Sequence, residues 1–256
     1  MKRYGGRVVF QTCDEMGTLQ VVQDAFERAL HFDSEPKQSA MDLGDPIRLV
    51  LSYTRAMLAP LLFVPSPRRI LLIGLGGGSI AKFLLHHYPD AHVDVVELRE
   101  KVVAVARDWF GLPEDKRLRV FVEDGGDFVR GATEAWDLVL VDAFDRRGIA
   151  YSVCGPGFFG ALRERLRHGG LLAINLWSRD TVGLEDMIGD IGAAFDAPVS
   201  RLPVQGKDNV IAIAGAGPLP RRSARPLSDR ARELESRLGL EFPSLLRTLR
   251  KHNPGY

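Results

Sequence analysis

The middle of the chain contains four groups of residues whose types and spacing could bind a nucleoside. The first is a glycine-rich turn after the apolar run Ile70–Ile73, with glycine at Gly74, Gly76, Gly77 and Gly78. Glycines at such a turn allow a tight bend and a close approach of the backbone to a ligand. Glu97 ends a second apolar run about 20 positions later, where a carboxylate can accept hydrogen bonds from ribose hydroxyls.

Two further acidic positions follow the next two apolar runs. Asp124-Gly125 comes after Leu118–Val122, and Asp142 ends the run that begins at Trp136. Ligands of open α/β sheets bind at the carboxyl ends of the strands, so a strand order of 3-2-1-4 would bring all four groups to one rim. These groups also have structural explanations. The glycine-rich turn could serve only the packing of a helix on the sheet, Glu97 could be a surface carboxylate, and Asp124 could be a helix N-cap. Their coincidence at consecutive strand ends favours a nucleotide or nucleoside site.

The elements that would position these residues alternate between strand and helix from Arg69 onwards. Repeated βα units predict an α/β fold with a mostly parallel, doubly wound, Rossmann-like sheet. Helices are predicted at Ser79–His87, Glu100–Trp109, Gly157–Arg167 and Thr181–Phe195, and a fifth strand at Gly170–Leu176. Val199–Val204 and Val210–Ala214 flank a short polar turn and predict a closing hairpin.

The chain divides into three predicted parts. Residues 1–44 form a small antiparallel β unit, with strands expected at Arg7–Cys13, Thr18–Gln23 and Arg28–Phe32. Residues 45–217 form the nucleotide-binding domain, and a helix is expected to open it at Asp45-Pro46, because aspartate is a good N-cap and proline suits the first helical position. Helical spacing continues to Leu62. Residues 218–256 form a basic tail with a helix near Ser228–Leu238.

Composition excludes several classes of partner. The 256 residues carry a net charge of +1, so no strong field would attract nucleic acid or an anionic membrane. Two cysteines, Cys13 and Cys154, cannot form a disulfide framework or a metal cluster, and nothing else indicates a metal. The N-terminus lacks the apolar segment of a signal peptide, and the apolar windows are too short to span a bilayer. A cytoplasmic location is therefore expected.

From about Gly5 to Ala214 the sequence resembles the spermidine synthases, also called polyamine aminopropyltransferases, and looks like a divergent bacterial member. The resemblance rests on the order and spacing of Ile73-Gly74-Leu75-Gly76-Gly77-Gly78-Ser79, Val95-Val96-Glu97, Glu123-Asp124-Gly125 and Val141-Asp142-Ala143-Phe144-Asp145. It implies a class I methyltransferase-like fold, polyamine biosynthesis, and aminopropyl transfer from decarboxylated S-adenosylmethionine to a small-molecule amine. Methylthioadenosine would be the second product. It also implies a homodimer or tetramer that associates through the N-terminal β unit.

The resemblance assigns roles to individual residues. Glu97 would hold the ribose, Asp124 the adenine, and Asp142 would be the catalytic base or amine-binding carboxylate, which suits a reaction whose amine must lose a proton. Asp145 keeps an Asp-x-x-Asp spacing and would contact the far side of the substrate. Gln38 corresponds to a glutamine near the cofactor. On the substrate side are Tyr53, which could instead be a core residue, and Tyr151, which could instead be a surface aromatic.

Several positions depart from the family pattern. Gly77 stands where the family has an aspartate that holds the amine end of the decarboxylated cofactor, Arg55 adds positive charge beside Tyr53, and Arg146 replaces a proline. Ser200–Pro203 lacks the aromatic residue that lines the family's polyamine tunnel. These changes leave two alternatives open. One is a methyltransferase that uses ordinary S-adenosylmethionine and forms S-adenosylhomocysteine with another nucleophile as acceptor. The other is a non-catalytic nucleoside-binding protein.

Overall fold

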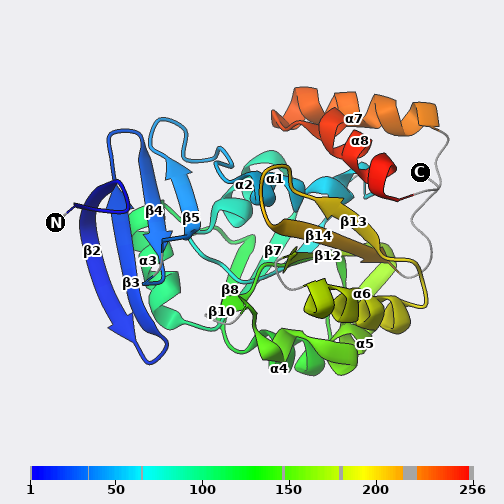
Figure 1. The fold of residues 1–256 in the computed structure, drawn as a ribbon, viewed down its shortest axis with the longest axis horizontal. Coiled ribbons are helices and arrows are strands. Elements are labelled where there is room, and N and C mark those ends of the chain that lie inside the picture. Colours follow the sequence, from blue (N-terminus) through cyan, green and yellow to red (C-terminus); the bar gives the residue numbers. More distant parts are fainter. Residues whose placement is uncertain are drawn as a thin grey trace.

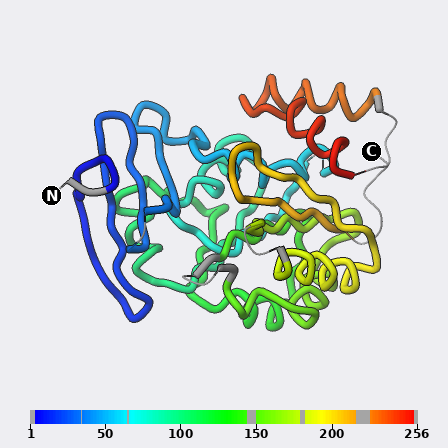
Figure 2. Tube along the Cα trace, viewed as in Figure 1, coloured from blue at the N-terminus to red at the C-terminus, as the bar shows by residue number. Residues whose placement is uncertain are grey.

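Two β-sheets, one small and one large, organise the chain (Figure 1). The computed structural model describes residues 2–33, 35–64, 66–145, 148–178, 181–215 and 224–253. The small N-terminal sheet lies at the left end of the long axis, and the C-terminal helical hairpin lies at the upper right, beside one edge of the large sheet (Figure 2). The predicted α/β class, with a separate N-terminal β unit, is confirmed.

The N-terminal sheet contains five antiparallel strands in chain order. They are β1 (Lys2–Arg3), β2 (Gly6–Asp14), β3 (Gly17–Gln23), β4 (Glu27–His31) and β5 (Lys37–Asp42). The three strands predicted in this region correspond to β2, β3 and β4. The sequence pattern did not reveal β5, although its Ser39, Ala40 and Met41 are buried. Arg99 anchors this sheet to the rest of the molecule, because its guanidinium lies 2.7 Å from an Asp14 carboxylate oxygen in a largely buried ion pair.

The large sheet has seven strands in the order β13-β14-β12-β9-β6-β7-β8. Their bounds are β6 (Arg69–Ile73), β7 (His92–Glu97), β8 (Leu118–Val122), β9 (Trp136–Val141), β12 (Leu166–Trp177), β13 (Ser200–Pro203) and β14 (Asn209–Gly215). Strands β8, β7, β6 and β9 are parallel neighbours, which is the 3-2-1-4 order that brings the four groups of residues to one rim. Strand β14 runs antiparallel to β12 and forms the expected closing hairpin with β13.

Helices cover both faces of the large sheet (Figure 1). They are α2 (Ser79–His87), α3 (Glu100–Phe110), α4 (Gly125–Gly131), α5 (Gly155–Arg165) and α6 (Thr181–Phe195). Two apolar clusters result, one on each face. The first joins α2 and α3 to the N-terminal sheet and the C-terminal helices, and the second joins α4, α5 and α6 around the fully buried Trp136. This two-faced burial explains why the strands read as continuous apolar runs.

The helix predicted to begin at Asp45-Pro46 does not form there. The structure has only a short helix α1 (Ser52–Ala56), followed by a 3-10 turn at Ala59–Leu62. Asp45 does accept hydrogen bonds from the backbone amides of Ile47 and Arg48, at 3.2 and 3.3 Å, as a capping residue would. The Arg55 guanidinium, however, donates to the carbonyls of Leu49 and Val50. An irregular segment, whose carbonyls are held by the Arg55 side chain, therefore takes the place of the first turns of the predicted helix.

The C-terminal segment folds into a helical hairpin of α7 (Ala224–Leu238) and α8 (Phe242–His252). Helix α7 corresponds to the predicted helix, whereas α8 was not predicted. An ion pair at 2.9 Å between Arg55 and Glu241 ties the hairpin to α1. Asn253 fastens its end to β13, because its side chain bonds both the amide and the carbonyl of Arg201 at 2.8 Å. The part of the chain described here includes no helix long and apolar enough to cross a membrane.

Lys82 is a buried cation in α2. Its Nζ donates to the Phe110 carbonyl at 2.6 Å, and burial lowers its pKa to about 8. Since an unfolded lysine has a pKa of about 10.4, the unfolded chain binds the proton more tightly, and stability rises with pH between these values. In urea unfolding, we expect wild type to gain about 2 kcal/mol from pH 8 to pH 10 relative to Lys82→Met, which lacks the titrating group. Parallel pH profiles for the two proteins would contradict this assignment.

Candidate active site

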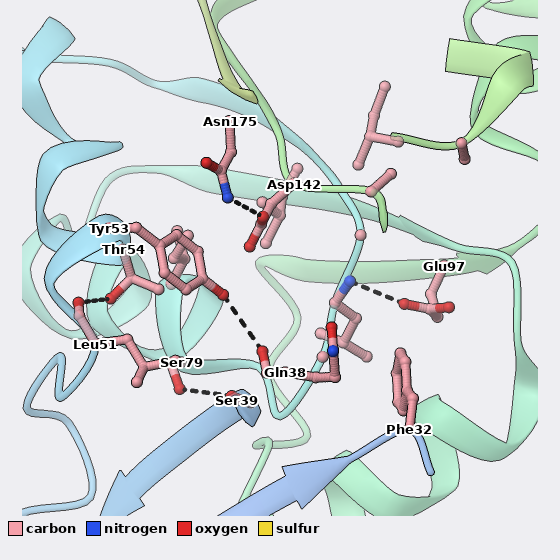
Figure 3. A pocket seen from close by; sticks show the side chains of 18 of the residues that line it. Phe32, Gln38, Ser39, Leu51, Tyr53, Thr54, Ser79, Glu97, Asp142 and Asn175 are labelled. Atoms are coloured by element: carbon pink, nitrogen blue, oxygen red, sulfur yellow. Dashed lines mark hydrogen bonds between the residues drawn. The ribbon is translucent and has the colours of Figure 1, made fainter. Parts of the chain in front are cut away.

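A cavity of about 840 Å³ opens at the carboxyl ends of β6, β7 and β9 (Figure 3). Besides those strand ends, its walls come from the β4–β5 loop, α1, the loop before α5, the end of β12 and the β13–β14 turn. Eight of the residues singled out in the sequence line it: Gln38, Tyr53, Gly74, Gly76, Glu97, Asp124, Gly125 and Asp142. The expectation that consecutive strand ends meet on one rim therefore holds.

The glycine-rich turn passes so close to the end of β9 that its first position cannot carry a side chain. Gly74 has φ +94°, and a Cβ on it would lie 2.2 Å from the Asp142 carbonyl oxygen. Gly77 and Gly78, by contrast, do not line the cavity. A Cβ on Gly77 would lie 2.8 Å from both the Phe110 ring and the Ser39 hydroxyl. The space that an aspartate at this position would need is thus filled by neighbouring side chains.

Glu97 is buried and clamps the glycine-rich turn. One carboxylate oxygen accepts from the Leu75 amide and the other from the Arg99 amide, each at 2.9 Å. Burial raises the pKa of Glu97, and these backbone donors oppose the rise. The alternative of an ordinary surface carboxylate is wrong, because only 8% of Glu97 is exposed. The Gly76 amide also hydrogen-bonds this carboxylate. A carboxylate has about four acceptor sites, so Glu97 can still accept a hydrogen bond from a ligand in the cavity.

Asp124 is the N-cap of α4. Its Oδ1 accepts from the amides of Gly126 at 2.9 Å and Asp127 at 3.0 Å, which confirms the structural explanation considered for it. The cap does not exclude a second role, since the carboxylate also lines the cavity and its Oδ2 takes no part in the cap. The following Gly125 is tightly packed, and a Cβ there would lie 2.6 Å from the Ile73 side chain.

Asp142 follows β9 and is surrounded by hydrogen-bond donors. Asn175 donates from Nδ2 to Asp142 Oδ1 at 2.9 Å, and the Tyr53 ring points its hydroxyl toward the same region (Figure 3). Burial raises the pKa of Asp142, while hydrogen bonding from Asn175 and Tyr53 lowers it. Burial and the negative charge of Asp142 together raise the pKa of Tyr53. The phenol therefore keeps its single proton, which is shared between Asp142 and the Gln38 carbonyl oxygen 3.3 Å away.

Besides Gly77 and Gly78, two more of the expected site residues, Tyr151 and Asp145, are not among the described residues that line the cavity. Tyr151 is 94% exposed and does not line the cavity, although its neighbours Ala150 and Ser152 do. The backbone of Asp145 belongs to the short strand β10 (Phe144–Asp145), which pairs with β11 (Gly148–Ile149). The side chain of Asp145 lies outside the part of the molecule that is described. The substrate role of Tyr151 and the catalytic role of Asp145 stay predictions.

Sequence reasoning missed several polar or aromatic residues of the cavity wall, and four of them bear on the chemistry of the site. They are Ser39, Asn175, Trp177 and Asn209. Asn175 had a detectable signal, because it interrupts the apolar run of β12 and is only 2% exposed. Trp177 supplies an aromatic ring from the end of β12, whereas the aromatic expected from the family pattern was sought in Ser200–Pro203. Among the described residues, no group of three or more His, Cys, Asp or Glu side chains could hold a metal ion.

The seven-stranded sheet, the glycine-rich turn and the acidic strand ends define a Rossmann-like protein of the kind shared by methyltransferases and spermidine synthases. A probable spermidine synthase from Corynebacterium glutamicum superimposes with a TM-score of 0.76 at 21% identity, over 90% of this chain and 88% of that one. Human methyltransferase-like protein 13, solved in complex with SAH, superimposes with a TM-score of 0.66 at 25% identity, over 74% of this chain and 93% of that one.

Sequence comparison narrows the class to one family. The model of the spermine/spermidine synthase domain matches residues 51–178. A polyamine aminopropyltransferase from Chromobacterium violaceum is 37% identical over 248 residues, which cover 96% of this chain and 95% of that protein. The chain belongs to the spermine/spermidine synthase family, as its sequence motifs predicted.

Proposed function

We propose that the protein binds decarboxylated S-adenosylmethionine and transfers its aminopropyl group to a small-molecule amine. The observation that carries the proposal is the position of the partly buried carboxylate of Asp142. It lies in the same cavity as Glu97 and the glycine-rich turn, which suit a nucleoside. A nucleoside-linked donor and an amine acceptor could therefore meet beside one carboxylate. Membership of the spermine/spermidine synthase family supports the same reaction.

The cofactor would use the residues at the strand ends. Glu97 would accept a hydrogen bond from the ribose hydroxyls with the acceptor site that its three backbone donors leave. Asp124 would accept from the adenine amino group, and the backbone at Gly74 and Gly76 would approach the sulfonium end. The absence of side chains at these two glycines makes that approach possible.

The chemistry is an in-line displacement at carbon. The acceptor nitrogen attacks the aminopropyl carbon bonded to the sulfonium sulfur, so a C–N bond forms while the C–S bond breaks and its electrons neutralise the sulfur. Methylthioadenosine leaves. The attacking amine must be neutral or lose its proton during attack, and Asp142 would take that proton. Burial raises the pKa of Asp142, which makes the carboxylate a stronger base than an exposed one.

Calorimetric titration with three ligands tests the proposal. We expect decarboxylated S-adenosylmethionine and methylthioadenosine to bind, and ordinary S-adenosylmethionine to bind at least about tenfold more weakly than the decarboxylated form. Glu97→Gln should weaken all three about 10- to 100-fold, because its amide nitrogen would face the Leu75 or Arg99 amide. An amine panel then identifies the acceptor from methylthioadenosine release. Failure of all three ligands to bind would refute the cofactor assignment.

A methyltransferase is the second candidate, and one observation favours it. The space at Gly77 is closed by Ser39 and Phe110, so a cofactor tail in this part of the cavity would face the neutral hydroxyls of Ser39 and Ser79, 3.2 Å apart, instead of a carboxylate. A neutral wall would not repel the carboxylate of ordinary S-adenosylmethionine. If ordinary S-adenosylmethionine binds more tightly than the decarboxylated form in the titration, the methyltransferase interpretation is supported. If a ligand binds but no acceptor is turned over, the remaining interpretation is a non-catalytic nucleoside-binding protein.

A further inference from the structure

Behind Asp142, two asparagines form a hydrogen-bonded chain that leads away from the carboxylate. Asn175 of β12 donates from Nδ2 to Asp142 Oδ1 at 2.9 Å (Figure 3). Asn209, the first residue of β14, donates in turn from Nδ2 to Asn175 Oδ1 at 2.9 Å. The two strands are antiparallel neighbours in the sheet, so their pairing register sets the spacing of this chain.

The donors in this pair of hydrogen bonds all point toward Asp142, from Asn209 to Asn175 and from Asn175 to the carboxylate. An asparagine amide offers donors on one side and an acceptor on the other. The Asp142 carboxylate only accepts, so the donor side of Asn175 faces it, and the hydrogen bond from Asn209 to the acceptor side of Asn175 reinforces this orientation. Rotation of this amide by half a turn would place its oxygen against a carboxylate and leave a buried donor pair facing Asn209. Asn175 is only 2% exposed, so water cannot offset that cost.

We infer that Asn175 and Asn209 are positioning residues that hold Asp142 Oδ1 and leave Oδ2 as the atom that receives the proton of the acceptor amine. This inference rests on the proposed function for the role of Asp142. An amide neither gives up nor takes a proton at ordinary pH, so Oδ1 stays occupied throughout turnover. Its donor also stabilises the ionised carboxylate against the effect of burial. Asn209 acts only through Asn175.

Asn209→Asp is the sharpest test, because a carboxylate at this position offers only acceptors. It should draw the Asn175 donors toward itself and turn the Asn175 oxygen to Asp142. We expect kcat to fall about 100-fold, with KM changed less than about threefold and the acidic limb of the pH profile moved upward. Asn209→Leu removes the orienting donor without attracting the amide, and should cost about fivefold.

A double-mutant cycle separates the amide reversal from the added charge. If Asn209 acts through Asn175, then Asn209→Asp should cost less than about threefold in an Asn175→Leu background. An equal loss in both backgrounds would overturn the inference. Asn253→Asp makes the same chemical change at the end of the C-terminal hairpin, away from the cavity, and should keep wild-type turnover. Cofactor titration checks that each variant is folded.

An NMR titration of the Asp142 carboxyl in the ligand-free protein keeps this inference separable from the proposed function. We expect Asn209→Asp to raise the pKa of Asp142 by more than Asn209→Leu does, and the difference to shrink in the Asn175→Leu background. That result supports the positioning role even if no acceptor is found for the wild type. A pKa of Asp142 that is insensitive to residue 209 overturns the role even if aminopropyl transfer is confirmed.

Discussion

Asp142→Asn is expected to lower the turnover of aminopropyl transfer about 10³-fold, within the usual contribution of a positioned base. Asparagine has nearly the same shape but cannot accept the amine proton. Its oxygen would accept from Asn175, as Oδ1 does at 2.9 Å in the wild type, so its amide nitrogen would face the acceptor amine. Initial rates of methylthioadenosine release measure the loss.

The affinity for the cofactor should change little in this variant, because Glu97 and the glycine-rich turn are untouched. Calorimetry therefore distinguishes a lost base from a damaged site. Asp186→Asn is the matched control, since Asp186 is exposed on α6 and does not line the cavity. Retention of more than about a tenth of wild-type turnover by Asp142→Asn would show that Asp142 is not the base. Comparable inactivation of Asp186→Asn would point to a general effect of the substitution.

The pH dependence of the wild type should follow from the same carboxylate. Protonation removes the base, so turnover falls as the pH drops through the pKa of Asp142. Because burial raises that pKa, the fall should begin at a higher pH than for an exposed aspartate.

Gly74→Ala is expected to have the largest effect on folding. The new methyl group would lie 2.2 Å from the Asp142 carbonyl oxygen, and the φ of +94° is unfavourable for alanine. The surrounding backbone cannot easily move, since Gly74 donates to Val96 and Asp142 donates to Ile73, each at 2.8 Å. We expect a loss of about 4 kcal/mol or more, and a melting temperature lower by about 10 °C.

Thermal unfolding followed by circular dichroism measures this change. Gly160→Ala is the control, because a Cβ on Gly160 meets no atom within 4 Å and the residue lies inside α5. There the substitution should stabilise the protein by about 0.5–1 kcal/mol, since alanine restricts the unfolded chain and favours the helix. A drop of less than about 3 °C for Gly74→Ala would mean that the turn can move away from β9.

The sequence alone determined the α/β class, the alternation of strands and helices, and the acidic residues at the strand ends, whereas the strand order that joins those ends in one rim came from the structure. These features depend on local patterns: apolar runs, the spacing of helices, and a glycine-rich turn whose backbone permits the bend. The predicted helix α2 (Ser79–His87) was correct at both ends for this reason. Glu97, Asp124 and Asp142 were identified from the sequence because each lies at or just after the end of a recognisable strand.

Only the tertiary structure decided what surrounds those carboxylates. Asn175 reaches Asp142 across 33 positions, and Asn209 reaches Asn175 across 34, through strand pairings whose register no local pattern specifies. The helix expected from Asp45-Pro46 did not form, and Arg55, which holds the carbonyls of Leu49 and Val50, also pairs with Glu241, 186 positions away in the sequence. No local pattern around Gly77 indicates that Phe110 and Ser39 fill the space where a side chain at this position would lie. Local propensity sets the elements, whereas contacts between distant side chains depend on packing geometry that forms only when the whole chain folds.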